Sequence, residues 1–241
     1  MPRYLYVLII ALSILCSESI FAACGGTVRT WDGGGTNNRW RSNANWSSNN
    51  QPNTTSEDAV IVSNAGKPNT NIDGATVTIG CFEVQSGQHK STNNKTIIIT
   101  GDYYRATTAN SLDYRNTHPN HFIEMGGSGA QTFEAVDPVN NLTISNNTTV
   151  TLTHPFILRN SLNLTGTTST VLINANLTLN AGSTTLNIPA GVTVEVGNGA
   201  TLSALEGITV NGTLKIKDGS SVIVANGKTL QVNSGGVLQL A

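Results

Sequence analysis

The chain has 241 residues, of which only 11% are charged and 38% are hydrophobic, and its formal net charge is −1. Ordinary globular proteins carry about 25% charged residues. The 13 Lys and Arg are balanced by 14 Asp and Glu, which excludes the basic stripe that a nucleic-acid partner requires. The sequence is rich in Asn, Thr, Ser and Gly with aliphatic residues at intervals, which predicts short strands joined by tight turns.

The N-terminus has the pattern of a signal peptide. Arg3 precedes a mostly apolar run that ends at Leu15, and small residues follow at Ala22 and Ala23. This run is well short of the roughly 20 residues that a membrane-spanning helix needs. We therefore expect residues 1–22 to be removed. The mature protein is then exported to the cell surface, the extracellular space or the periplasm, and it does not span a membrane.

The cysteines point to a disulfide. Removal of the signal peptide takes away Cys16 and leaves Cys24 and Cys81 in a compartment where disulfides persist. We expect these two to be bonded. Two free thiols are one alternative, and lipidation of Cys24 is another, because the four residues that end there form an imperfect lipobox. Structural zinc takes about four clustered Cys or His ligands, so we expect no metal at the cysteines and no cofactor.

Residues 23–57 form a distinct segment that we expect to be an N-terminal cap. Its glycines at 33–35 lie in a stretch of Asn, Ser and Thr, and a strand-like run follows at 57–62. A solenoid closes its open end with an atypical cap, and large aromatic side chains suit that role. Exposed tryptophans can instead stack on sugars, so a glycan-binding platform is the alternative. All three tryptophans of the chain lie here: Trp31, Trp40 and Trp46.

Residues 58–139 are predicted to form irregular first coils, interrupted by an insertion at 101–127. Insertions in solenoids map to surface loops, which often bind ligands. An ordinary solvated loop is the alternative. His118, His121 and Glu124 do not predict a zinc site, because residues three apart on an extended chain face opposite ways. The candidate glycan or partner contacts of this region are Tyr103, Tyr104, Arg105, Tyr114 and Arg115.

Residues 140–241 repeat with a period of about 22. Strand-like triplets recur at a nearly constant spacing, with three strands in each repeat. Such a period indicates a solenoid, in which each coil buries its apolar face only against its neighbours. The sequence predicts an all-β, right-handed, three-sided parallel β-helix, with an all-β sandwich as the competing fold. The triplets begin at Leu142, Leu162, Leu186, Ile208 and Leu230.

A gapless alignment of the last three coils predicts which side chains enter the core, because side chains alternate along a strand. Every inward position is then apolar except Gly236. The predicted inward columns are Leu186–Ile208–Leu230, Ile188–Val210–Val232, Val194–Ile216–Leu238, Val192–Leu214, Ala200–Val222 and Leu202–Val224; the outward columns are Asn187–Thr209–Gln231 and Glu195–Lys217–Gln239, with Asn211 over Asn233 in a turn.

Two segments resemble large bacterial surface β-helix proteins. The first is residues 31–62, WDGGGTNNRWRSNANWSSNNQPNTTSEDAVIV, which is similar to the opening of autotransporter-like and haemagglutinin-like adhesins. The second is residues 126–156, GGSGAQTFEAVDPVNNLTISNNTTVTLTHPF, which is similar to the segment with which such proteins enter a regular repeat. The chain also resembles secreted proteins linked to the biogenesis of mannose-sensitive haemagglutinin pili. These resemblances imply an exported β-helix and supply no catalytic residues.

The function expected from the sequence is non-catalytic: adhesion, or an extended stalk that binds a surface glycan or protein of the host or of bacteria. A polysaccharide lyase or hydrolase is the first alternative. Such enzymes need clustered acids, as a carboxylate pair or as Ca²⁺ ligands. From residue 142 to the end the only acids are Glu195, Glu206 and Asp218.

Ice binding is the second alternative, because Thr149, Thr151 and Thr153 alternate along one strand. A threonine ladder must recur in every coil, whereas the predicted outward columns mix Thr with Asn, Glu, Lys and Gln.

The last coil stops at Ala241 without a polar cap, and an uncapped solenoid end exposes unpaired backbone groups. We therefore expect a further portion of the same polypeptide or end-to-end self-association.

Overall fold

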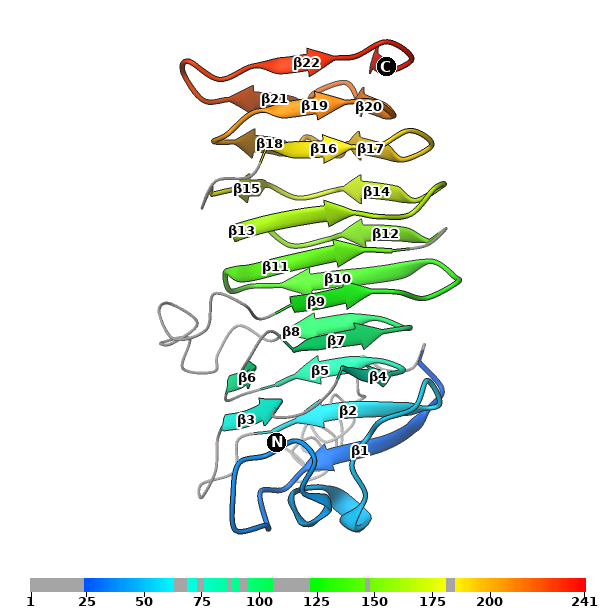
Figure 1. Ribbon diagram of the computed structural model, residues 1–241, viewed down its shortest axis with the longest axis vertical. Helices are drawn as coiled ribbons and strands as arrows, with labels where there is room; N and C mark the ends of the chain where they lie inside the picture. The colour runs from blue at the N-terminus through cyan, green and yellow to red at the C-terminus, as the bar shows by residue number, and fades with distance from the viewer. Residues whose placement is uncertain are drawn as a thin grey trace, which may run out of the picture.

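The structure is a computed structural model that describes residues 24–62, 69–72, 76–85, 88–91, 95–105, 122–145, 148–180 and 185–241. Over these residues the chain winds into a β-solenoid of about seven turns, with about 21 residues per turn. Figure 1 shows the turns stacked into a rod, with the cap residues at one end and the C-terminal coils at the other. The expected all-β solenoid is confirmed. The expected signal peptide lies outside the described residues.

The strands pair in parallel and lie on three faces. The first face is a ten-stranded sheet of β1 (Thr27–Trp31), β2 (Glu57–Ile61), β5 (Phe82–Val84), β8 (Tyr103–Arg105), β10 (Gln131–Ala135), β12 (Thr149–Leu152), β14 (Thr170–Ile173), β17 (Thr193–Val196), β20 (Thr213–Ile216) and β23 (Val237–Leu240). The second face holds β3 (Asn69–Ile72), β6 (Gln88–Ser91), β15 (Leu177–Leu179), β18 (Thr201–Ala204) and β21 (Ser221–Val224).

The third face holds β4 (Val77–Ile79), β7 (Thr96–Ile99), β9 (Phe122–Met125), β16 (Leu186–Ile188), β19 (Ile208–Val210) and β22 (Leu230–Val232). Strands β11 (Val139–Ile144) and β13 (Phe156–Leu164) run around the corner between the second and third faces. They join strands of both faces into one eight-stranded sheet. Two short 3-10 segments, η2 (Asn43–Asn45) and η3 (Ser47–Asn49), lie in the cap.

On the third face the predicted register of the last coils is confirmed. Asn211 and Asn233 of the adjoining turn form a ladder with Asn187 of β16: Asn211 Nδ2 donates to Asn187 Oδ1 at 2.9 Å, and Asn233 Nδ2 donates to Asn211 Oδ1 at 2.8 Å. The confirmed inward columns are Leu186–Ile208–Leu230 and Ile188–Val210–Val232, with Asn187–Thr209–Gln231 between them.

On the first and second faces the predicted register is wrong by two residues. The turn between Val210 and Thr213 is two residues shorter than its counterparts, and a longer turn before Leu230 restores the period. A Cβ on Gly212 in the short turn would collide with the carbonyl oxygen of Pro189. Because a shift of two preserves alternation, the residues predicted to face inward still do so, and Val196, Ala204 and Leu240 are added to them. The corrected columns are Val194–Leu214–Leu238, Val196–Ile216–Leu240, Leu202–Val222, Ala204–Val224 and Glu195–Lys215–Gln239.

The cap is built on the three tryptophans, whose side chains are fully buried. Trp46 packs edge-on against Trp31 and Trp40, with ring centroids 5.2 Å and 4.6 Å apart. The indole N–H groups of Trp40 and Trp46 both have hydrogen-bond acceptors. Trp40 Nε1 donates to the Pro52 carbonyl at 3.1 Å, and Trp46 Nε1 donates to the Trp40 carbonyl at 2.7 Å. Trp40 then contacts Phe82 of β5 at 5.7 Å. The tryptophans therefore close the core at this end, as a solenoid cap must.

A disulfide between Cys24 and Cys81 ties the start of the described chain to an early coil, as expected. The buried carboxylate of Asp58 bridges the same two segments. It accepts from the Gly26 amide at 3.0 Å and from the Cys81 amide at 2.7 Å. The covalent and the hydrogen-bonded link thus hold the cap in one position.

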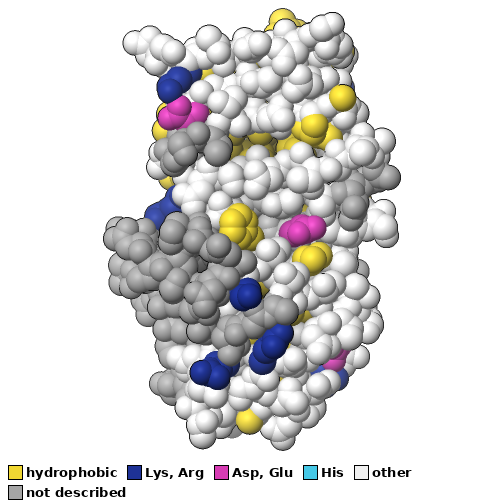
Figure 2. Space-filling view, viewed as in Figure 1, with side chains coloured by type: hydrophobic (Ala, Val, Ile, Leu, Met, Phe, Trp, Pro, Cys, Tyr) yellow, Lys and Arg dark blue, Asp and Glu magenta, His cyan; other side chains and the backbone are white. Residues whose placement is uncertain are grey.

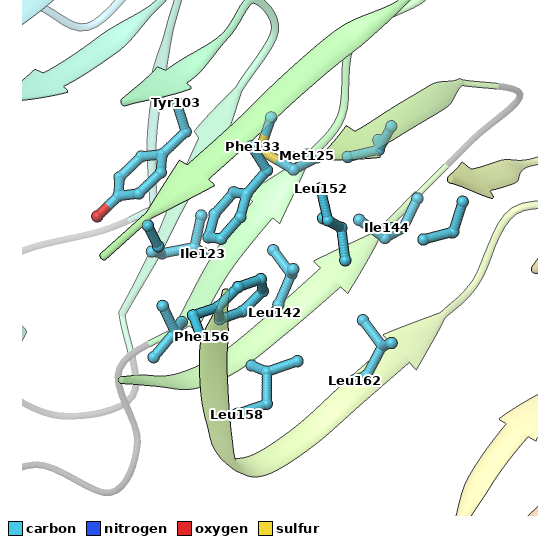
Figure 3. Close-up of a cluster of buried hydrophobic side chains, with 14 of the residues drawn as sticks. Tyr103, Ile123, Met125, Phe133, Leu142, Ile144, Leu152, Phe156, Leu158 and Leu162 are labelled. Carbon is cyan, nitrogen blue, oxygen red and sulfur yellow. The ribbon is translucent and has the colours of Figure 1, made fainter. Parts of the chain in front are cut away.

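An aromatic row continues from the cap into the first coils. Phe82 contacts Tyr103 at 5.7 Å, Tyr103 stacks on Phe133 at 4.7 Å, and Phe133 packs on Phe156 at 5.3 Å. Figure 3 shows aliphatic side chains around Tyr103, Phe133 and Phe156. In the later coils, aliphatic side chains fill the core without aromatic ones. The labelled aliphatic neighbours and the methionine in that view are Ile123, Met125, Leu142, Ile144, Leu152, Leu158 and Leu162.

In the part of the chain that the structure describes, no helix has the length and hydropathy needed to cross a membrane. At the C-terminal end, Leu238 and Leu240 of β23 are 44% and 77% exposed. A further portion of chain or a stacked copy over this end stays a prediction.

Candidate functional site

The candidate contact residues differ sharply in their exposure. Trp31, Trp40, Trp46, Tyr103 and Arg105 are at most 2% exposed. The tryptophans therefore offer no ring face to a sugar. Their burial supports the predicted cap, and the alternative that they form a glycan-binding platform is wrong. Tyr104 is partly exposed. The remaining candidates, Tyr114 and Arg115, lie outside the described residues, as do His118 and His121.

Strand β8 explains why Tyr104 differs from its neighbours, because side chains alternate between the two sides of a strand. Tyr103 and Arg105 point into the solenoid, and Tyr104 points outward. Arg105 Nε donates to Asp137 Oδ2 at 2.8 Å, and burial raises the pKa of the Tyr103 phenol. Arg105 therefore supports the coil from within, which corrects the expectation that its side chain contacts a ligand. The Tyr103 side chain is also buried, although Tyr103 lines a pocket next to Tyr104.

Around Tyr104 the first face contains a pocket of about 120 Å³. In the strand register, Glu83 of β5 and Glu134 of β10 are the two neighbours of Tyr104. A carboxylate thus lies on each side of the phenol. The pocket is lined by Cys24, Glu83, Asp102, Tyr103, Tyr104, Thr132 and Glu134, and we call it the Tyr104 pocket.

Glu83 is the most unusual group in this pocket. Strand alternation turns it outward, yet it is only 3% exposed. Its Oε1 accepts from Gln85 Nε2 at 2.9 Å, whereas its Oε2 is buried and has no hydrogen-bond partner. Burial raises the pKa of the Glu83 carboxyl above its ordinary value of 4.5, and the Gln85 hydrogen bond acts against that shift. Buried polar atoms are normally paired, so an unpaired carboxylate oxygen in a pocket indicates a position for a donor.

The other two acids of the pocket, Asp102 and Glu134, differ from Glu83 because each accepts a hydrogen bond from a neighbouring strand or turn. Asp102 Oδ1 accepts from the Thr132 amide at 2.6 Å, so this carboxylate also holds β10 against β8. Glu134 Oε2 accepts a long hydrogen bond of 3.4 Å from Thr153. The pKa of the Tyr104 phenol is raised by burial first and then by the negative charges of Glu134 and Glu83. Both glutamates therefore lie close enough to the ring to act on it electrostatically.

The backbone beneath the pocket is held firmly. The Asp102 amide donates to Cys81 Sγ at 3.0 Å, so the disulfide supports the turn that precedes Tyr104. Cys24, the other half of the disulfide, lines the pocket itself. A site built on paired strands and a disulfide keeps its geometry without a ligand, which favours binding.

The outer side of the first face in the later coils carries a second ordered feature. The corrected register stacks four threonines in one outward column, Thr149–Thr170–Thr193–Thr213. The neighbouring column reads Thr151–Leu172–Glu195–Lys215. An ice-binding plane needs regular columns side by side, and on these four strands only one column is uniform. Glu195 is also engaged, with Lys215 Nζ at 3.0 Å and Lys217 Nζ at 2.6 Å.

Over the described ranges, no group of three or more His, Cys, Asp and Glu side chains is placed to hold a metal ion. Comparisons with models of protein families, with curated proteins and with solved structures found no match.

Sequence reasoning missed the two glutamates that flank Tyr104. Glu83 precedes Tyr104 by about one coil of chain, whereas Glu134 follows it by clearly more than one coil. The second spacing exceeds the repeat because the insertion falls between β8 and β10. An available signal was the alternation in FEV, YYR and TFEA, each of which places a polar or aromatic residue between two inward ones.

Proposed function

We propose that this chain is an exported, non-catalytic β-solenoid that acts in adhesion or as an extended binding stalk, and that its ligand occupies the Tyr104 pocket. The observation that carries the proposal is a pocket beside an outward aromatic ring, lined by Glu83, whose buried carboxylate has one oxygen without a hydrogen-bond partner. A ligand that donates to this oxygen and packs on the ring would use both groups. Surface glycans and proteins both present such donors.

Two further observations support an exported rod. The Cys24–Cys81 disulfide suits a compartment outside the reducing cytosol. The solenoid places its pocket on the side of a stack of coils. On the face shown in Figure 2, the described atoms are mostly backbone and side chains that are neither hydrophobic nor charged, with a few charged side chains among them. Such a surface suits a spacer with a localised contact site.

The test is binding of the mature protein to a glycan array and to intact cells. Tyr104→Ala removes the ring at the pocket and is expected to weaken binding at least tenfold. The matched control is Thr193→Ala, an outward residue on the same face several coils away. Circular dichroism should show the same fold for both variants. Unchanged binding by Tyr104→Ala, or an equal loss in the control, would refute the proposal.

A polysaccharide-active enzyme is a second candidate, favoured by the placement of Glu83 and Glu134. They lie two strands apart, which separates their Cα atoms by about 10 Å. Carboxyl groups of inverting glycosidases are about 6.5–9.5 Å apart, and the general acid has a raised pKa, as Glu83 has. Release of reducing ends from acidic and neutral polysaccharides, abolished by Glu83→Gln, would establish this activity. Absence of release from all of them would dismiss it.

A further inference from the structure

The charge of the Tyr104 pocket narrows the chemistry of its ligand, and this step rests on the proposed binding function. Among the described residues that line the pocket, three of seven are acids, and none is Lys, Arg or His. Arg105, the cationic residue nearest in sequence, points into the core and pairs with Asp137. None of the described residues that line the pocket therefore neutralises its acids.

The burial of the Glu83 carboxylate makes the excess of negative charge in the pocket important for ligand binding. An ionised carboxylate that is removed from water needs a paired charge or several hydrogen bonds. One oxygen of Glu83 accepts from Gln85, and the other oxygen has no donor. A neutral donor such as a hydroxyl would satisfy that oxygen but would leave the charge uncompensated. A cationic donor would satisfy both.

The geometry also discriminates among cations. Tyr104 lies between Glu83 and Glu134, so these two carboxylates approach from opposite sides of the ring rather than from one side. Asp102 already accepts from the Thr132 amide. This arrangement does not gather the compact set of oxygens that a divalent cation takes. An ammonium group needs only one carboxylate partner and is attracted to an aromatic face, so it matches the Glu83 carboxylate beside the Tyr104 ring.

We propose that the Tyr104 pocket binds a primary ammonium group, with Glu83 accepting its hydrogen bond, the Glu134 carboxylate adding negative charge beyond the ring, and the Tyr104 ring packing against its carbon atoms. A volume of about 120 Å³ has room for several water molecules, and therefore for an ammonium with a short alkyl chain. A lysine side chain and an amino sugar both present this group, and the experiment separates them.

The experiment measures binding of n-butylammonium chloride to the mature protein by chemical-shift titration at neutral pH. The matched neutral probe is n-butanol, which has the same carbon chain without the charge, and D-glucosamine represents the amino sugars. Butylammonium is expected to bind at least tenfold more tightly than butanol. Binding of butylammonium alone identifies an alkylammonium such as lysine, and binding of glucosamine as well extends the site to amino sugars. Equal affinity for butylammonium and butanol, or no binding of either amine, overturns the proposal.

Two variants tie the result to the pocket. Glu83→Gln keeps the shape of the side chain, removes its charge and is expected to weaken butylammonium binding at least tenfold. Glu195→Gln removes a carboxylate from the same face of the solenoid outside the pocket and is expected to leave the affinity unchanged. Because burial raises the pKa of Glu83, ionising it opposes folding as the pH rises through that pKa. Glu83→Gln should therefore unfold at the same or a higher temperature at neutral pH, so lost binding would not reflect lost folding.

The two proposals can fail separately. If amines do not bind but adhesion still depends on Tyr104, the ammonium inference is overturned and the binding function stands. If amines bind at the pocket but adhesion is unaffected by Tyr104→Ala, the adhesive role of the pocket is overturned and the ammonium site stands.

Discussion

Replacing both disulfide cysteines by serine should destabilise the cap by an amount that follows from the length of the loop. Cys24 and Cys81 are 57 residues apart. In the chain-entropy description, closing a loop of that length in the unfolded chain contributes about 4 kcal/mol. For a domain of this size, about 4 kcal/mol corresponds to a fall in Tm of about 8–16 °C.

The native contacts around the disulfide indicate that the serine variant still folds. Asp58 continues to accept from the Gly26 and Cys81 amides, and the tryptophan cluster of the cap does not involve the cysteines. The loss should therefore come mainly from the greater entropy of the unfolded chain.

The assay is thermal unfolding followed by circular dichroism, with and without dithiothreitol. The reductant should lower the Tm of the wild-type protein to that of Cys24→Ser/Cys81→Ser, and it should leave the Tm of the variant unchanged. A variant that melts within about 2 °C of the oxidised wild type would refute the loop-entropy argument. If mass spectrometry of the unreduced protein shows free thiols at Cys24 and Cys81, the disulfide on which this prediction depends is absent.

Three further predictions concern the regular coils. Leu202 is fully buried, whereas Leu205 is 40% exposed. Leu202→Ala should therefore lower the free energy of unfolding, measured in urea, by about 3 kcal/mol, and Leu205→Ala should lower it by clearly less. Equal losses in the two variants would contradict the inward columns. Ile216→Asp should remove hydrogen-exchange protection from the last coils, because Ile216 packs against the core; retained protection would show that its side chain faces solvent. Hydrogen bonds with its two lysines lower the pKa of Glu195, so its contribution is present above pH 4.5 and is lost as the pH falls through the lowered pKa. Glu195→Gln should therefore destabilise by under about 1 kcal/mol at pH 7 and not at all in strong acid, and a difference that grew in acid would be inconsistent with this pairing.

Much of the candidate site could not be predicted from the sequence. The sequence marked Tyr103, Tyr104 and Arg105 together as surface contacts, but alternation in β8 leaves only Tyr104 on the outside. The alternation of side chains along a strand, which predicts the inward residues of the regular coils, also predicts that Tyr103 and Arg105 face inward. It could not have paired Tyr104 with Glu134, because the insertion stretches that spacing well beyond the length of one coil.

By itself, the sequence determined the β-solenoid, the cap, the disulfide and the inward residues. Hydrophobic alternation has a period of two, and a register error of two residues does not move an apolar side chain out of the core. Only the tertiary structure decided which residues of neighbouring coils touch, because that depends on the length of each turn, as the short turn at Gly212 shows. For the same reason the fold alone brought Glu83, Tyr104 and Glu134 to one pocket, since strand pairing joins residues that lie far apart along the chain.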